Sequence, residues 1–160
     1  MVIATGVDIV KIARFANMTA HFQSRVYTQY EQAYIAKKGP ATAAGLFAAK
    51  EAVAKALGTG ISGFWPTDIE ITHSQQGAPV VTLHSNAALI ACKLASATSL
   101  RSARRQPRGK GAALSRFSHC AGDDDFRDSR KGRFRSRYKF HLSISHTDTD
   151  AIAFAVLSKH

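Results

Sequence analysis

The feature that most constrains the fold of this chain is an alanine-rich stretch at residues 47–60, FAAKEAVAKALGTG. It predicts an amphipathic helix that ends at a glycine loop. Glu51 and Lys55 are four residues apart, so they project from one face of that helix. A carboxylate, an ammonium group and flexible glycine backbone suit a magnesium–phosphate ligand. The same spacing is also typical of a solvated surface pair, but the flanking alanines leave room for a close approach and favour a site.

Residue patterns on both sides of this stretch predict an α+β fold, in which antiparallel strands pack with helices in a single domain, residues 1–160. The capping-box sequence that begins at Thr28 predicts the start of one of the helices. We expect strands at 2–10, 68–72 and 80–84, a C-terminal hairpin of 140–146 with 151–157, and helices at 11–22, 28–38, from Thr42 through the alanine-rich stretch, and at 86–97.

The net charge of +11 is concentrated in one segment. Residues 101–139 hold thirteen Lys and Arg against four Asp, and the rest of the chain is almost neutral. Few large aliphatic residues lie there, so we expect 98–139 to be a long, mobile, basic, Arg/Ser-rich insertion within the domain. One hypothesis is a nucleic-acid-binding protein that uses this segment on a catalytically inactive scaffold. The scarcity of aromatic residues and the absence of a recognised binding motif count against it.

The cysteine and hydropathy patterns indicate a cytoplasmic protein. Cys92 and Cys120 are far apart and form neither a CxxC pair nor a zinc-type spacing, so both thiols are expected to be reduced. No apolar run approaches the roughly 18 residues that a membrane-spanning helix needs. The first residues lack the basic and long apolar regions of a secretory signal. We therefore expect no membrane association.

Three sequence blocks occur in a characteristic order. The first is GVDIV at 6–10, followed by Arg14; the second is the stretch at 47–60; the third is LSISHT at 142–147. In this combination the chain resembles the holo-[acyl carrier protein] synthases, which are small single-domain 4′-phosphopantetheinyl transferases. The second block is the most specific of the three.

The resemblance covers about residues 1–97 and 138–160. It implies a 4′-phosphopantetheinyl transferase-like fold and a Mg²⁺-dependent reaction. The 4′-phosphopantetheine group of coenzyme A would pass to a serine of apo acyl carrier protein, and adenosine 3′,5′-bisphosphate would be released. Family members of this size resemble half of the longer two-repeat transferases, which implies a homotrimer with sites at the subunit interfaces.

The resemblance also assigns roles to residues. Asp8 and Glu51 match the metal ligands, Glu51 and Lys55 the catalytic pair, and His146 the contact to the 3′-phosphate of the nucleotide. The proton acceptor stays open between Glu51 and a metal-bound water. The residues matched to coenzyme A binding are Lys50, Lys55, Gly58, Gly60, Ser145, His146 and Thr147, and those matched to carrier-protein binding are Arg14 and Arg25.

Two features depart from the family pattern. Leu46 stands directly before Phe47, where family members commonly have an arginine that would help to hold the coenzyme A phosphates. The second departure is the segment 98–139, since the family usually has a short loop there. Only His146 among the histidines is interpreted as functional. The others are interpreted as structural or surface residues: His21, His73, His84, His119, His141 and His160.

Overall fold

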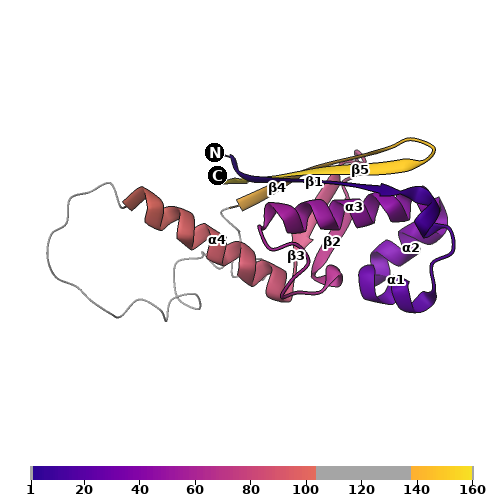
Figure 1. Ribbon diagram of the computed structural model, residues 1–160, viewed down its shortest axis with the longest axis horizontal. Helices are drawn as coiled ribbons and strands as arrows, with labels where there is room; N and C mark the ends of the chain where they lie inside the picture. The colour runs from indigo at the N-terminus through magenta and orange to yellow at the C-terminus, as the bar shows by residue number, and fades with distance from the viewer. Residues whose placement is uncertain (1, 104–137, 160) are drawn as a thin grey trace, which may run out of the picture.

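A long central helix, α3 (Pro40–Ala56), lies against one face of a three-stranded sheet, and most of the other helices and a second sheet lie on the side of α3 away from that sheet (Figure 1). The computed structural model describes residues 2–103 and 138–159, with side chains described up to Leu94 in the first range. The sheet contains β1 (Val2–Lys11), β5 (Asp150–Lys159) and β4 (Tyr138–His146), antiparallel and in that spatial order. The α+β fold expected from the sequence is confirmed.

A second, two-stranded antiparallel sheet lies beyond α3 and pairs β2 (Ile69–His73) with β3 (Pro79–Leu83). The helical elements around it are two 3₁₀ turns and three α-helices. They are η1 (Ile12–Phe15), α1 (Ala20–Val26), α2 (Gln29–Lys38), η2 (Pro66–Asp68) and α4 (Ser85–Ala103). Within the described ranges, none of the helices has the length and apolar character needed to cross a membrane.

Several predicted boundaries were wrong. The helix expected at 11–22 is split, because the Thr19 hydroxyl accepts a hydrogen bond from the Phe22 N–H at 3.1 Å and starts α1 afresh. The helix expected from Thr42 begins instead at Pro40, whose fixed φ suits the first helical position. Part of the expected insertion is regular structure, since α4 runs to Ala103 and β4 starts at Tyr138. The remainder, 104–137, lies outside the described residues.

The capping box at the start of α2 is present as predicted. The Thr28 hydroxyl accepts from the Glu31 N–H, and Glu31 Oε2 accepts from the Thr28 N–H at 2.8 Å. Glu31 is completely buried, and its other carboxylate oxygen accepts from the Ile71 N–H at 2.8 Å. One acidic side chain therefore fixes the start of α2 and also ties that helix to β2.

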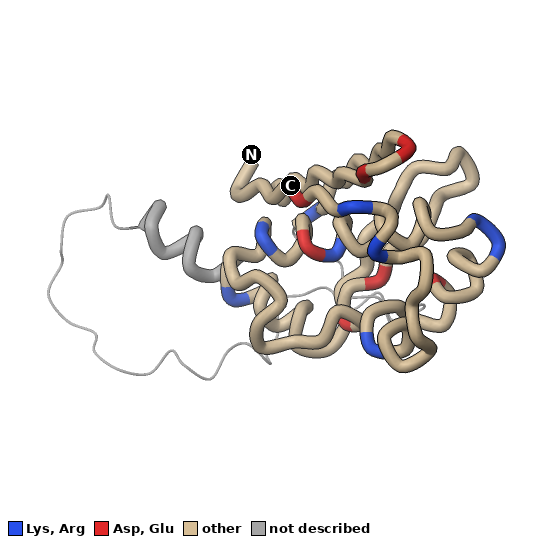
Figure 2. Tube along the Cα trace, turned by 45° about the vertical axis from the view of Figure 1, so that its right-hand side comes forward, with Lys and Arg blue, Asp and Glu red and all other residues tan. Residues whose placement is uncertain are grey.

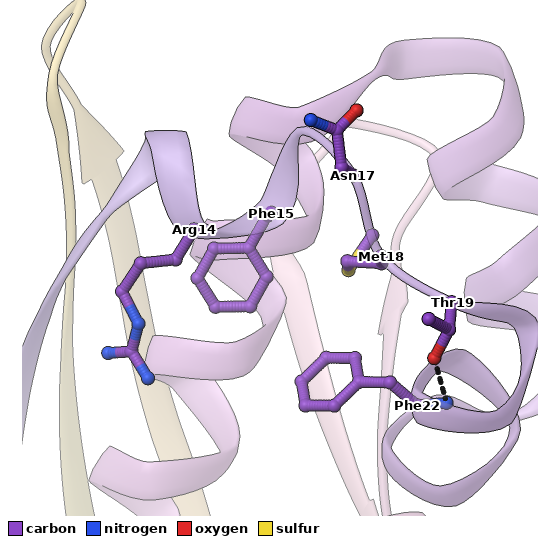
Figure 3. Close-up of a pocket in the computed structure, with 6 residues that line it drawn as sticks. All are labelled: Arg14, Phe15, Asn17, Met18, Thr19 and Phe22. Carbon is purple, nitrogen blue, oxygen red and sulfur yellow. Dashed lines mark hydrogen bonds between the residues drawn. The ribbon is translucent and has the colours of Figure 1, made fainter.

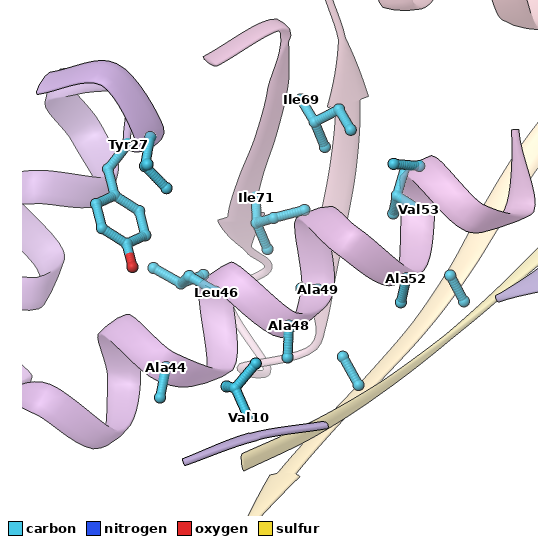
Figure 4. Close-up of a cluster of buried hydrophobic side chains, with 14 of the residues drawn as sticks. Val10, Tyr27, Ala44, Leu46, Ala48, Ala49, Ala52, Val53, Ile69 and Ile71 are labelled. Atoms are coloured by element: carbon cyan, nitrogen blue, oxygen red, sulfur yellow. The ribbon is translucent and has the colours of Figure 1, made fainter. Parts of the chain in front are cut away.

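The alanines of α3 allow its neighbours to approach closely. Leu46, Ala52 and Val53 lie in a core that also receives Ile71 from β2 (Figure 4). On the other side of the helix, Gly6 of β1 packs directly on the α3 backbone. A Cβ added at Gly6 would overlap the carbonyl oxygen of Ala52, so only glycine fits at this crossing. The GVDIV block thus begins with the residue that lets β1 contact α3.

The outer face of the three-stranded sheet is apolar and uncovered by the described part of the chain. Side chains alternate along β1, so Asp8 and Val10 face α3 while Val7 and Ile9 face outward. The cross-strand pairs Val7–Phe154 and Ile9–Ile152 place four apolar side chains on this outer face. All four are between 42% and 64% exposed. We call these four residues the outer sheet face.

Candidate active site

The first candidate site is a cluster of Asp8, Glu51 and Lys55 where β1 crosses α3. Asp8 lies two residues after Gly6 and on the same face of β1, so the close crossing carries its carboxylate to the C-terminal half of the helix. Lys55 Nζ donates to Asp8 Oδ1 at 2.7 Å and to the Val7 carbonyl oxygen at 2.8 Å. The structure thus brings together three residues that the sequence analysis assigned to one site.

The electrostatics of the cluster favour a bound cation. Burial raises the pKa of Glu51, the negative charge of Asp8 raises it further, and Lys55 lowers it in part. Asp8 Oδ2 is buried and has no hydrogen-bond partner among the described residues. Two carboxylates that repel one another, with one oxygen unsatisfied, provide the hard anionic ligands that Mg²⁺ prefers.

The described residues contain no group of three or more His, Cys, Asp or Glu side chains that would suit a metal ion. The pair of carboxylates nevertheless fits magnesium. This ion usually takes one or two protein carboxylates and completes its octahedron with water and phosphate oxygens. The donor set therefore suits an ion that is shared with a phosphorylated ligand, rather than one enclosed by protein alone.

The structure does not bring Lys50 to this cluster, and we correct its assignment to coenzyme A. Only 1% of its surface is exposed. Its ammonium pairs with Glu31 Oε2 at 2.8 Å and donates to the carbonyl oxygens of Pro66 at 2.9 Å and Ile69 at 2.5 Å. Three partners use all three N–H groups. Lys50 therefore joins α2, α3 and β2 and has no donor left for a ligand.

The glycine loop directly follows the cluster. Gly58 and Gly60 have φ values of +79° and +58°, a left-handed conformation that other residues rarely adopt. The Gly58 N–H donates to the Lys55 carbonyl oxygen at 2.9 Å and ends α3. A Cβ at either position would meet nothing within 4 Å, so the loop borders open space. The loop is therefore open to solvent directly after the helix turn that carries Lys55.

The third sequence block lines a cavity that lies away from the acidic cluster. This cavity, of about 180 Å³, lies beside the N-terminal half of α3, and we call it the His146 cavity. Six of the residues that line it are Tyr34, Thr42, Leu46, His73, Ile144 and His146. The His146 ring directs Nδ1 toward the Thr147 carbonyl oxygen at 3.1 Å. Ser145 and Thr147 are exposed on either side of His146.

The His146 cavity and the acidic cluster occupy opposite ends of α3. From Leu46, which lines the cavity, to Lys55 is nine residues, or about 13–14 Å at 1.5 Å per residue. Leu46 itself is 2% exposed, and its side chain packs near Tyr27 and Ile71 (Figure 4). The residue that replaces the family's arginine is thus part of the core, and it presents only apolar atoms to the cavity.

A second cavity, of about 270 Å³, lies beside η1 and the start of α1 (Figure 3). Arg14 stands at its edge, and Phe15, Met18 and Phe22 provide its apolar walls. We call it the Arg14 cavity. Arg25 does not line it, but its guanidinium stacks 4.8 Å above the ring of Trp65, which is 59% exposed. The two arginines assigned to a carrier protein thus lie beside exposed aromatic or apolar surface.

Basic residues are spread around the described part of the chain rather than gathered on one face (Figure 2).

The sequence interpretation missed two aromatic residues of the His146 cavity. The rings of Tyr34 and His73 lie 4.7 Å apart at an interplanar angle of 31°. His73 had been interpreted as structural, because no local pattern connects a residue at the end of β2 with a motif some seventy residues later.

The three-block resemblance agrees with comparisons to known proteins. Residues 4–115 match the 4′-phosphopantetheinyl transferase superfamily. A holo-[acyl-carrier-protein] synthase of Clostridium perfringens (strain 13 / Type A) is 36% identical over 98% of this chain and 94% of its own length.

Solved structures agree in fold. The Helicobacter pylori holo-[acyl-carrier-protein] synthase in complex with coenzyme A is 26% identical, with a TM-score of 0.57 over 96% of this chain and 99% of its own. A Bacillus anthracis holo-(acyl-carrier-protein) synthase with CoA (3′,5′-ADP) has a TM-score of 0.63 over 100% of this chain and 99% of its own; at 24% identity it supports the fold alone. The extent and identity of these matches show that this chain belongs to the 4′-phosphopantetheinyl transferase superfamily.

Proposed function

We propose that this protein is a holo-[acyl carrier protein] synthase. It transfers the 4′-phosphopantetheine group of coenzyme A to a serine of apo acyl carrier protein in a Mg²⁺-dependent reaction and releases adenosine 3′,5′-bisphosphate. The observation that carries the proposal is the meeting of Asp8, Glu51 and Lys55 beside an open glycine loop. The names of the relatives point to the same activity.

Asp8 and Glu51 would hold the magnesium ion, whose role is to neutralise charge on the pyrophosphate of coenzyme A. Metal binding would also satisfy the buried Asp8 oxygen and relieve the repulsion that raises the pKa of Glu51. Both features are costs of the metal-free fold. Because metal binding would remove both costs, the two carboxylates fit a metal site better than they fit a surface ion pair.

Lys55 is the chain's own positive charge at the reacting phosphate. Its side chain is 48% exposed, and its ammonium contacts Asp8 and the Val7 carbonyl oxygen on β1. A preorganised ammonium stabilises the charge that develops in phosphoryl transfer. The serine oxygen forms a new bond to phosphorus as the P–O bond of the pyrophosphate breaks. The serine proton passes to a nearby base, and Glu51 offers a carboxylate close to Asp8 and Lys55 for that role.

The carrier protein is proposed to dock over η1 and α1. The Arg14 cavity combines a guanidinium group with apolar walls, and Arg25 adds a second positive charge on Trp65. Charge of this kind would attract an acidic partner and orient it. The docking surface begins within a few residues of the end of β1, which also carries Asp8. A serine delivered there would be held near the acidic cluster.

A homotrimer with sites between subunits is supported by two observations. The outer sheet face exposes four apolar side chains, Val7, Ile9, Ile152 and Phe154, on one surface. The His146 cavity and the acidic cluster lie at opposite ends of α3, so residues from neighbouring copies would complete the site. Sedimentation should then give three times the chain mass of 17.3 kDa. A monomer at micromolar concentration would contradict the assembly.

The test of the activity is direct. The full chain is incubated with coenzyme A, Mg²⁺ and apo acyl carrier protein, and mass spectrometry follows the addition of one phosphopantetheine to the carrier. Asp8→Asn should lower the rate by about 100-fold or more, since it removes a metal ligand while keeping the shape of the side chain. No modified carrier with the unaltered chain would refute the proposal, and an undiminished rate with Asp8→Asn would refute the metal site.

A further inference from the structure

His73 lies in the His146 cavity and has an unsatisfied ring nitrogen. Its Nδ1 is buried and has no hydrogen-bond partner among the described residues. Tyr34 stacks on the ring from α2 at 4.7 Å, which fixes its orientation. A buried polar atom without a partner is uncommon in a folded protein, because it loses its hydrogen bonds to water without replacement. The Tyr34–His73 ring pair thus leaves one polar atom, His73 Nδ1, without a partner among the described residues.

The same cavity lacks the charged side chain that a phosphate would normally attract. Among the described residues that line it, none is a lysine or an arginine. Leu46 stands where an arginine is usual in the resembling family, and it is 2% exposed. The hydrogen-bonding ring groups that remain beside His146 are those of His73 and Tyr34. Phosphate oxygens need N–H or O–H donors around them, so these rings are available partners together with the Thr42 hydroxyl.

We propose that His73, held in place by Tyr34, is a specificity-determining residue that helps this protein to select coenzyme A by its 3′-phosphate, in the role that an arginine at position 46 would otherwise fill. The inference rests on the proposed function and on the match, implied by the family resemblance, of His146 to the contact with the 3′-phosphate of the nucleotide. It adds a contact from β2 that the sequence motifs do not include. A 3′-phosphorylated nucleotide would thus be held from two elements, β4 and β2.

The experiment compares two nucleotides that differ only in the 3′-phosphate. Calorimetry measures the binding of adenosine 3′,5′-bisphosphate and of adenosine 5′-monophosphate to the full chain with Mg²⁺. His73→Phe keeps a ring for Tyr34 to stack on but removes both nitrogens. We expect this variant to bind adenosine 3′,5′-bisphosphate about 10-fold more weakly, the size of one lost hydrogen bond to a charged group, and to bind adenosine 5′-monophosphate unchanged.

The control is His84→Phe, the same substitution at an exposed histidine beside the end of β3, which pairs with Glu70. It should change neither affinity. An equal preference in His73→Phe and the unaltered chain, with matching melting temperatures, would overturn the role of His73 alone. Failure of the unaltered chain to bind either nucleotide would overturn both this inference and the proposed function.

Discussion

Two lysines on α3, five residues apart, have opposite surroundings. Lys50 is 1% exposed and has three oxygen partners, while the side chain of Lys55 is 48% exposed and contacts a carboxylate that keeps one unsatisfied oxygen. Burial lowers the pKa of Lys50, and Glu31 opposes that shift. The first pair is complete within the fold, and the second leaves polar groups available. An incomplete pair at a close crossing of two elements is the better indication of a site.

The largest expected effect concerns the complete pair. Lys50→Met should lower the free energy of unfolding by about 3–5 kcal/mol, because it leaves Glu31 buried without a counter-charge. Denaturant unfolding measures the loss. Lys55→Met is the matched comparison on the same helix and should cost about 1 kcal/mol or less, since its ion pair is partly exposed. Equal losses in the two variants would remove the distinction between the pairs.

The second effect is on activity, where Lys55 matters more than Lys50. Lys55→Met should lower kcat/KM for carrier-protein modification by about 10²–10³-fold, the usual result of removing one preorganised charge from a phosphate site. The protein should remain folded, as judged by its melting temperature. Lys37→Met, at an exposed lysine near the end of α2, serves as the control and should keep full activity. A normal rate in Lys55→Met would remove this residue from the catalytic site.

The smallest effect is a pH-dependent one at Glu51. Because its pKa is raised in the folded state, ionisation opposes folding, and this cost grows as the pH rises above the ordinary value of 4.5. Without metal at neutral pH, Glu51→Gln should therefore melt about 1–2 °C above the unaltered protein. The difference should disappear in acid, where both side chains are neutral.

Adding magnesium should reverse the difference in melting temperature between the unaltered chain and Glu51→Gln. It should raise the melting temperature of the unaltered chain but not that of Glu51→Gln, because only the former keeps both metal ligands. A stabilisation of the glutamine variant equal to that of the unaltered chain would argue against Glu51 as a ligand.

Much of the candidate site was predictable from local sequence. The spacing of Glu51 and Lys55 places them on one helix face, and the glycines at 58 and 60 mark the end of that helix. The capping sequence at Thr28 identified the start of α2. These predictions succeeded because each depends on interactions between residues within about four positions of one another. The predicted start of α3 at Thr42 was wrong, since Gly39, with an unusual φ of +93°, joins α2 directly to a helix that begins at Pro40.

The roles of residues that depend on partners distant in the sequence were harder to predict. Lys50 belongs to the most specific motif, and the family resemblance matched it to coenzyme A binding. One position along a helix is a rotation of about 100°, which turns Lys50 into the core while Glu51 faces β1. The partner that decides its role, Glu31, lies nineteen residues earlier, on α2. Likewise, His73 joins His146 only because β2 and β4 both lie beside α3.

The sequence by itself determined the helix that carries Glu51 and Lys55, the glycine loop that follows it, and the family to which the chain belongs, because these depend on short-range spacing and on the order of motifs along the chain. Only the tertiary structure decided that Asp8 meets Lys55, that Lys50 is enclosed with Glu31, and that His73 lines the cavity of His146. Those outcomes depend on burial and on long-range contacts, and burial decides whether a charged side chain holds the fold together or remains available to a ligand.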